Sequence, residues 1–304
     1  MTQLTRICSL LPSATEIVCA LGLEDNLVGI THECDYPTSI DGIPVVTKSL
    51  INQSENNSSQ IDSHIKRAAH NGSGIYSINS TIFRSITPDL ILTQELCEVC
   101  AVSYRSVEES VRKLDGAPKI LSLEPKNIAD ILDSIEIVGS LTGSSLAAQS
   151  ISSNIRSRID KIRKSLIDIK RIPKVLMLEW LDPPFVGGHW IPEMIKTLGA
   201  GNAYDLTNQP SREVTWQKLL HEKIDIVILA VCGFDLERTL IEFPSTKLGP
   251  FWDSYSGAVY AVDGSAYFSR PGPRIINGIE ILAEIIHPSV FPRKYPAEAW
   301  CQVI

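Results

Sequence analysis

Short apolar runs alternate with runs of helical periodicity along this chain. In the first half, the apolar runs predict strands at 6–11, 27–30, 89–93 and 118–123. The periodic runs between them predict helices at 13–21, 78–86 and 103–114. The second half repeats this alternation, with strands predicted at 174–180, 224–230 and 258–262 and helices at 191–198, 215–222 and 274–286. Because strands separated by helices pair in parallel, each half is predicted to be an α/β lobe whose central, mostly parallel sheet is flanked by helices.

The two halves follow one pattern in detail. From Arg6 a strand leads through a Pro/Ser turn into a helix that ends at Leu21-Gly22, and from Lys174 a strand leads through a loop into a helix that ends at Leu198-Gly199. The apolar run at 88–93 corresponds in the same way to the run at 224–229. Two lobes of one design are typical of proteins that hold a ligand in a cleft between the lobes.

The middle of the chain predicts two consecutive helices. Apolar residues recur at helical spacing from Asn127 to Leu141, and a second run continues to Ile169. At 1.5 Å per residue, a second run of about 25 residues is long enough to span a small domain, so it is predicted to be a rigid helix that connects the lobes. The predicted organisation is an N-terminal lobe at 1–143, a connecting helix at 144–170 and a C-terminal lobe at 171–304. A polar insertion at about 51–75, with a short helix at 61–69, is predicted to be a mobile excursion from the first lobe.

Composition and charge narrow the class of partner. The chain has 304 residues, of which 44% are hydrophobic and 21% charged, as expected for two globular lobes. The net charge is −7, and the Lys and Arg residues that cluster most, at 156–174, are scattered, so nucleic acid is not expected as a partner. No apolar run reaches the roughly 20 residues that cross a bilayer, so no direct membrane insertion is expected.

The cysteines and the first residues predict the compartment. Seven cysteines, an odd number, are typical of a reducing environment. Pro12 interrupts the apolar Leu10-Leu11 pair, and Glu16 follows within the next predicted helix, so we expect a strand here and no export signal. The sequence therefore predicts a cytoplasmic protein.

Residues that follow the predicted strands form the candidate ligand surface. In doubly wound sheets, ligands bind beyond the carboxyl ends of the strands. The side chains at or near these positions that suit ligand binding are Ser13, His32, Glu33, Gln94, Trp180, Phe185, His189, Trp190, Phe234, Tyr267, Phe268 and Arg270.

Several short motifs along the chain resemble those of one family. They are Leu11-Pro-Ser-Ala-Thr-Glu16, Val28-Gly-Ile30 with Asp35-Tyr-Pro37, Pro88-Asp-Leu-Ile91, Pro183-Pro-Phe185 and Phe268-Ser-Arg-Pro-Gly-Pro-Arg274. In their order and spacing the chain resembles the solute-binding proteins of ABC importers whose two α/β lobes are joined by one long helix, and among these the cobalamin-binding members. The resemblance covers essentially the whole chain. It implies a non-catalytic protein that holds cobalamin or a related corrinoid between its lobes.

Two features depart from that family. Its members usually carry an export signal, and they dock on a membrane permease through one surface glutamate on each lobe. In this chain the helix before Pro88 has no acidic residue, and Gln217 occupies the corresponding position in the second lobe. The resemblance therefore implies binding of a corrinoid more directly than delivery of it to an importer.

A corrin ring is a large apolar plane rimmed with amides, so aromatic walls with polar tips suit it. The aromatic candidates are expected to form such walls, the alternative being that they fill the core. Trp190 is expected to lie outside the core, because it follows the flexible Gly187-Gly188 pair. In the same loop, His189 is a candidate axial ligand of the cobalt, or a loop residue that only donates hydrogen bonds. Arg270 is expected to bind corrin amides or to cap its own loop.

The cysteines support an alternative function. Cys97 and Cys100 have the Cys-x-x-Cys spacing of metal or redox sites, and Cys34 and Cys232 follow other strands that the fold directs to the same cleft. Four thiols could bind zinc or an iron-sulfur cluster, in a metal carrier or a redox protein, or coordinate the cobalt of a corrinoid. The competing interpretation is that these cysteines are small buried hydrophobes.

Catalytic arrangements are poorly supported. Ser13 with Glu16 fits a helix capping box better than a nucleophile with its base. Side chains of adjacent residues such as His32 and Glu33 tend to point in different directions. The sequence therefore predicts a protein that is not an enzyme and that binds a corrinoid for storage, salvage or delivery to a corrinoid-using enzyme or a permease.

Overall fold

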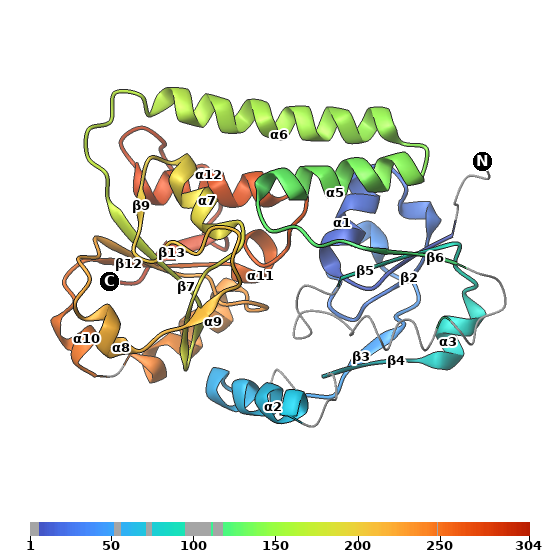
Figure 1. The fold of residues 1–304 in the computed structure, drawn as a ribbon, viewed down its shortest axis with the longest axis horizontal. Helices are drawn as coiled ribbons and strands as arrows, with labels where there is room; N and C mark the ends of the chain where they lie inside the picture. The colour runs from blue at the N-terminus through green and yellow to red at the C-terminus, as the bar shows by residue number, and fades with distance from the viewer. Residues whose placement is uncertain (1–5, 52–55, 71–74, 95–110, 112–117, 248) are drawn as a thin grey trace. The chain divides into compact units, whose positions relative to one another are not determined.

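The structure, a computed structural model, describes residues 6–51, 56–70, 75–94, 111, 118–247 and 249–304 (Figure 1). The chain forms two compact units. Unit 1 comprises Met1–Asn56, Ser63–Pro125 and Ala129–Ser153, and unit 2 comprises Asn57–Asp62, Lys126–Ile128 and Asn154–Ile304. The predicted domain boundaries and the cleft between the lobes stay predictions.

Unit 1 is built on a four-stranded parallel sheet. Its strands, in the spatial order β2-β1-β5-β6, are Leu27–Ile30, Ile7–Ser9, Leu90–Thr93 and Lys119–Ser122. The central pair is in register from Ile7 opposite Leu90, and both side chains are fully buried. The predicted parallel sheet is confirmed, with strands that begin or end up to two residues inside the predicted limits.

Helix α1 (Pro12–Ala20) follows β1 and packs against β1 and β2. The predicted capping box is wrong, because the N-cap is Leu11 and no side chain caps the helix. Pro12 takes the first helical position, where its fixed φ and missing N–H cost nothing, and this places Ser13 inside the first turn. Ser13 is 3% exposed there.

The region between β2 and β5 holds elements that the pattern only partly predicts. Its elements are β3 (Thr47–Ser49), α2 (Ser58–His70), β4 (Tyr76–Ile78) and α3 (Ser80–Ser85). Strands β3 and β4 form an antiparallel pair that was not predicted. The helix expected at 61–69 is present and begins three residues earlier, at Ser58. The mobility of the insertion stays a prediction.

Two helices follow β6, namely α5 (Ile128–Leu141) and α6 (Ser145–Ser165). The division between the units falls within α6, after Ser153. Helix α6 ends four residues before the predicted Ile169. The buried stripe of Ile155, Ile159 and Ile162 does not continue, because Ile167 and Ile169 are exposed. Pro173 also disfavours helical geometry in the residue before it.

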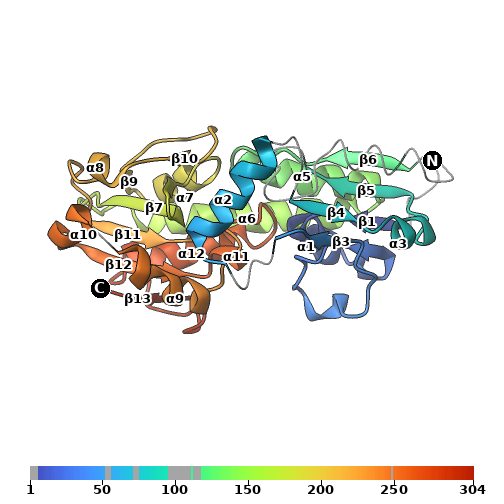
Figure 2. The same cartoon turned by 90° about the horizontal axis from the view of Figure 1, so that it is seen from below.

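Unit 2 repeats the strand order of unit 1. Its first strands are β7 (Lys174–Leu181), β8 (Pro184–Val186), β9 (Gly201–Asn202) and β10 (Arg212–Glu213), and the others are β11 (Ile226–Leu229), β12 (Ala258–Val262) and β13 (Trp300–Gln302). The parallel strands β9-β7-β11-β12 correspond to β2-β1-β5-β6, and β8, β10 and β13 add antiparallel neighbours. Figure 2 shows β7, β11, β12 and β13 in succession.

The helices of unit 2 cover this sheet. They are α7 (Ile191–Thr197), α8 (Trp216–Leu219), α9 (Leu236–Thr246), α10 (Pro250–Ser254), α11 (Gly264–Tyr267) and α12 (Ile275–Ile286). Helices α7 and α12 lie side by side, as Figure 1 shows, and nearly all of α12 is buried. The pattern predicted α7, α12 and a longer α8, but not α9, α10 or α11. Among the described residues, no helix combines the length and the apolar composition that crossing a membrane requires.

Candidate functional site

Buried hydroxyl groups lie at the carboxyl ends of the unit 1 strands. Ser9 ends β1, Thr31 follows β2 and Thr93 ends β5, and all three are at most 4% exposed. From helix α1, the Thr15 hydroxyl donates to Ser9 Oγ at 2.8 Å and lies 3.0 Å from Cys34 Sγ. The carboxyl edge of the unit 1 sheet is therefore lined by neutral groups that can form hydrogen bonds.

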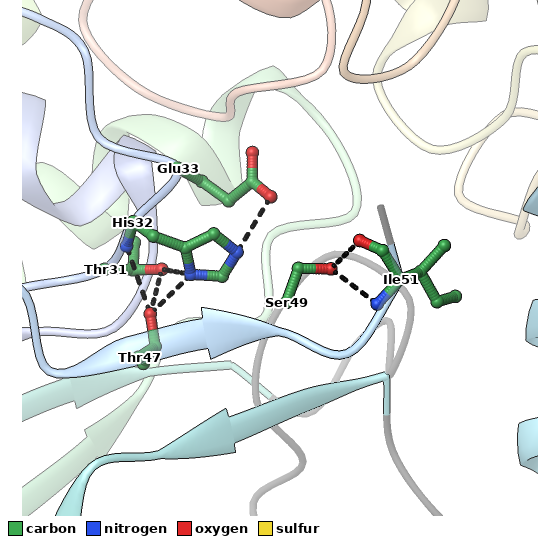
Figure 3. Close-up of polar contacts among 6 residues, drawn as sticks. All are labelled: Thr31, His32, Glu33, Thr47, Ser49 and Ile51. Atoms are coloured by element: carbon green, nitrogen blue, oxygen red, sulfur yellow. Dashed lines mark hydrogen bonds and ion pairs between the residues drawn. The ribbon is translucent and has the colours of Figure 1, made fainter. Parts of the chain in front are cut away.

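Thr47 of β3 fixes His32 at this edge, as Figure 3 shows. Its Oγ1 accepts from the backbone N–H of His32 at 3.1 Å, lies 2.7 Å from His32 Nδ1 and lies 2.8 Å from Thr31 Oγ1. The ring of Tyr76 is 5.2 Å from the imidazole ring. Sequence reasoning missed Thr47 and Tyr76, although the β-branched run Val45-Val46-Thr47 after Pro44 is a strand signal.

Glu33 lies on the other side of the same imidazole. Its Oε1 is 3.2 Å from His32 Nε2, so the two adjacent side chains point together and not apart (Figure 3). If the Thr31 hydroxyl donates to Thr47 Oγ1, the single hydroxyl proton of Thr47 is left to donate to His32 Nδ1. Nδ1 is then the acceptor, and the neutral imidazole carries its proton on Nε2, which faces the Glu33 carboxylate. Nε2 of His32 is buried and lies within ion-pair distance of Glu33, but among the described residues no hydrogen bond satisfies it.

The other unit 1 candidates are less clearly placed for a ligand. Ser13 is buried in the first turn of α1, and Gln94, directly after β5, is 7% exposed. Cys34 is half-buried beside Thr15, whereas Cys97 and Cys100 lie outside the described residues. Within the described part of the chain, no three His, Cys, Asp or Glu side chains come close enough together to hold a metal ion. The four-thiol site therefore stays an untested hypothesis.

Unit 2 presents aromatic rings at the carboxyl end of its sheet. Trp180, near the end of β7, packs edge-on against Phe234 with ring centroids 5.4 Å apart. Phe185 of β8 is opposite Trp180 in the strand register. The Arg238 guanidinium lies 3.6 Å from the centroid of the Phe234 ring, a cation–π contact that sequence reasoning missed.

Trp180 also binds the first turn of α2. Its Nε1–H donates to the carbonyl oxygen of Ser58 at 3.2 Å. The backbone N–H and the hydroxyl of Ser58 both donate to Glu242 Oε1 of α9, at 2.7 and 2.5 Å. The carboxylate of Glu242 thus caps the positive end of α2, where a negative charge is stabilising.

The half-buried carboxyl group of Glu179 organises the loop between β8 and α7. The Ser211 hydroxyl donates to Glu179 Oε2, and the backbone N–H of Gly188 donates to Ser211 Oγ at 3.1 Å. Burial raises the pKa of Glu179 to about 7, although the Ser211 hydrogen bond lowers it. No other residue fits at Gly188, because a Cβ there would lie 2.4 Å from the carbonyl oxygen of Gln209.

His189 follows with a left-handed backbone, at φ 51°, which is uncommon for a residue other than glycine. Its N–H donates to Gln209 at 2.7 Å, and its carbonyl accepts from Asn208 at 3.3 Å, so the tertiary structure holds this conformation. Burial lowers the pKa of the imidazole, and the charge of Lys126 lowers it further, so the ring is neutral at pH 7.

Trp190 is part of the core, contrary to expectation. It is 7% exposed, and its Nε1–H donates to the carbonyl oxygen of Phe268 at 2.9 Å. The backbone turn at His189 is the physical reason, because it directs the next side chain inward as the N-cap of α7. The ring of His189 stays half-buried, 5.6 Å from the indole.

Burial sorts the remaining candidates of unit 2. Phe234 and Phe268 are each 1% exposed, whereas Trp180, Phe185 and Tyr267 are half-buried and keep accessible ring surface. Arg270 is 8% exposed and donates to Ser265 Oγ of the preceding helix α11 at 3.1 Å. Contact of any of these residues with a ligand stays a prediction.

A cavity of about 290 Å³ lies at the opposite edge of the unit 2 sheet. Its walls come from residues that precede β11 and β12, among them Glu222, Asp225, Phe251 and Tyr255. It therefore does not coincide with the strand ends where the ligand surface was predicted.

Comparison with known proteins assigns this arrangement to a family. Residues 77–243 match the periplasmic binding protein family, and the chain belongs to it. The sequence is 24% identical over 301 residues to an uncharacterized ABC transporter substrate-binding lipoprotein, YvrC of Bacillus subtilis, covering 94% of this chain and 81% of that protein. It is 22% identical over 288 residues to the vitamin B12-binding protein of Vibrio vulnificus, covering 92% and 89%. A periplasmic heme-binding protein of Pseudomonas aeruginosa shares the fold, with a TM-score of 0.74, 16% identity and 98% coverage of both chains.

Proposed function

We propose that this protein is a non-catalytic binding protein for cobalamin or a related corrinoid. The observation that carries the proposal is the half-buried aromatic surface of Trp180 and Phe185 in unit 2, with the neutral imidazole of His189 in the same unit. Flat apolar rings offer a corrin plane the contact that it needs. Membership of a solute-binding family and relatives named as vitamin B12-binding proteins support the same conclusion.

His189 is the residue that we assign as an axial ligand of the cobalt. A neutral imidazole keeps the lone pair that a metal requires, and its lowered pKa preserves that form at pH 7. Among the described contacts, no hydrogen bond involves its ring, whereas both ring nitrogens of His32 have neighbours within 3.2 Å. The strained backbone at His189 is of the kind that persists where function requires it.

The choice between a corrinoid and haem depends on the groups at the ligand rim. A corrin is rimmed with neutral amides, whereas haem carries two carboxylates that favour cations. The buried strand ends of unit 1 offer hydroxyls, and Arg238 and Arg270 of unit 2 already contact Phe234 and Ser265. These groups favour the corrinoid.

The proposed role is storage, salvage or delivery of the corrinoid to an enzyme that uses it or to a permease. The odd number of cysteines, seven, supports a cytoplasmic location, which cell fractionation would test.

The direct test is retention of hydroxocobalamin. The purified protein is mixed with an excess, passed through gel filtration and examined by absorption spectroscopy, with metal analysis before and after. Corrin bands at near one per chain are expected. Retention of haem but not hydroxocobalamin in a parallel experiment would reject the ligand and keep the binding role. Stoichiometric zinc or iron without either macrocycle would reject both.

The axial ligand is tested with diaquocobinamide, a corrinoid without a nucleotide base. Binding is expected to shift its visible bands as an imidazole replaces water, and His189→Ala is expected to abolish the shift. His221→Ala, at an exposed histidine of the same unit, is the matched control and should keep it. An unchanged spectral shift in His189→Ala would overturn the assignment.

A further inference from the structure

The chain is acidic, but one segment is strongly basic. The basic segment, residues 156–174, holds eight of the chain's 28 Lys and Arg residues and two of its 35 Asp and Glu residues. It therefore carries +6, while the rest of the chain carries −13. The segment covers the end of α6 and the connection to β7 (Figure 1).

Only some of these cations form ion pairs with carboxylates of unit 2. Arg158 pairs with Glu280 at 2.6 Å, Arg171 with Asp225 at 3.1 Å and Lys174 with Glu222 at 2.5 Å. Three further cations, Lys161, Lys164 and Lys170, are exposed, and no ion pair of theirs is found in the described part of the chain.

Apolar side chains are exposed among these lysines. Ile167 is 77% exposed, Ile172 is 69% exposed and Ile169 is 37% exposed, in a stretch of six residues. The buried isoleucines of α6 face the core of the unit and end at Ile162, so the later ones have no such surface to cover. Large apolar groups grouped on a surface are typical of an interaction site, and cations around them narrow the class of partner.

We propose that the basic segment binds the surface of an anionic lipid bilayer. Ile167 and Ile172 enter the headgroup region, and Lys161, Lys164 and Lys170 approach the lipid phosphates. A bilayer is a better partner for this segment than an acidic protein. Lysine side chains are flexible and the isoleucines are separated from one another, so a fluid surface can adapt to them, whereas a protein surface has a fixed shape. Repulsion between the same lipids and the acidic remainder orients the molecule with this segment toward the membrane. The inference does not depend on the ligand.

Sedimentation with vesicles tests the proposal. The full-length protein is mixed with vesicles of phosphatidylcholine, or of equal parts phosphatidylcholine and phosphatidylglycerol, at low and at physiological ionic strength. Binding to the anionic vesicles alone, weakened by salt, is the expected result. Equal binding to both vesicles, or no binding to the anionic ones at low salt, would overturn it.

Two sets of variants assign the binding to this segment. The triple variant Lys161→Gln, Lys164→Gln, Lys170→Gln is expected to lower the partition coefficient about 100-fold at low ionic strength, at about fivefold per cation. The control changes the same net charge at three other exposed lysines, with Lys48→Gln, Lys119→Gln and Lys218→Gln, and should change it much less.

The apolar contribution is tested by Ile167→Ser with Ile172→Ser, expected to weaken binding about tenfold. Leu146→Ser with Ile241→Ser, at residues 84% and 73% exposed elsewhere, is the control. Circular dichroism checks that each variant is folded. A control variant that loses as much binding as its partner would overturn the proposal. So would retention on immobilised polyglutamate without vesicle binding, which would assign the segment to an acidic protein.

Discussion

The two units share a strand order but differ in the chemistry at their strand ends. In unit 1 the carboxyl edge holds Ser9, Thr31, Thr47 and Thr93, all buried hydroxyl residues. In unit 2 the same edge presents aromatic rings, with Trp180 against Phe234. If a ligand binds at the strand ends as predicted, the parallel core that the sequence repeats specifies the position of its surface, and the residues just after each strand specify the chemistry of that surface.

The histidines His32 of unit 1 and His189 of unit 2 also differ in how they are held. His32 is held by Thr47 on one ring nitrogen and faces Glu33 on the other. His189 is held through its backbone, and none of the described hydrogen bonds involves its ring. A side chain that is itself held by hydrogen bonds serves to position other groups. A neutral imidazole with a fixed backbone instead suits a metal.

The largest effect is expected when a buried aromatic residue of unit 2 is replaced and the loss of stability is compared with that of an accessible one. Trp190→Ala removes a buried indole and leaves the Phe268 carbonyl without its donor, so the free energy of unfolding should fall by about 3–5 kcal/mol. Trp180→Ala, at a half-buried ring, should cost about 1 kcal/mol. Urea unfolding followed by circular dichroism measures both. Equal losses would mean that Trp180 is also core and that unit 2 lacks the proposed aromatic surface.

The next largest effect is the pH dependence of Glu179. The folded protein raises the pKa of Glu179 from its ordinary value of 4.5 to about 7, so this group stabilises the fold below pH 4.5, and the contribution is lost as the pH rises through 7. Glu179→Gln removes that loss. Relative to the wild type, its free energy of unfolding should be higher at pH 8 than at pH 5, by up to about 3 kcal/mol.

Glu213→Gln, at an exposed carboxylate of β10 in the same sheet, is the control for this pH dependence. It should unfold like the wild type at both pH values. A wild-type pH profile in Glu179→Gln would show that the carboxyl group is solvated, and would remove one support of the loop that holds His189.

Trp180 connects the contrast to ligand binding. If the aromatic surface of unit 2 supplies the main contact with the corrin plane, Trp180→Ala should weaken hydroxocobalamin binding about 10- to 30-fold, or about 1.4–2 kcal/mol. Trp180→Phe should recover most of this loss, because it keeps a ring. Isothermal titration measures the affinities. A loss that Phe does not recover would assign the effect to the indole N–H that binds Ser58.

The hydroxyl surface of unit 1 should respond more weakly. Thr47→Val keeps the shape of the side chain but removes the acceptor of the His32 N–H and the neighbour of Thr31 Oγ1. The expected cost is about 1–2 kcal/mol of unfolding free energy, with little change in ligand affinity. Thr81→Val, at an exposed threonine in the same unit, is the control. A large loss of affinity in Thr47→Val alone would place the main binding contacts in unit 1.

The sequence predicts the scaffold better than the site because the two depend on different distances along the chain. Alternation of apolar and polar residues is local, so it predicts the described parallel strands except the two-residue β9, and most of the described helices between them. The orientation of Trp190 depends on the left-handed backbone of His189 and on Phe268, which is 78 residues away. Thr47 was missed because its strand has only three residues and pairs with β4, which follows α2 in the sequence. Short elements that depend on distant partners leave little periodic signal.

The smallest effect concerns Glu242, which caps the first turn of α2 where that turn also accepts a hydrogen bond from Trp180. Glu242→Gln keeps an acceptor for Ser58 but removes the charge at the N-terminus of α2, at an expected cost of about 0.5–1 kcal/mol. This loss should appear locally, as amide hydrogen exchange about two- to fivefold faster at 58–62 and unchanged in α12. Glu237→Gln, in the first turn of the same helix α9, is the control. If exchange at 58–62 is already fast in the wild type and does not change, the first turn of α2 does not stay on Trp180, and the indole is free for a ligand.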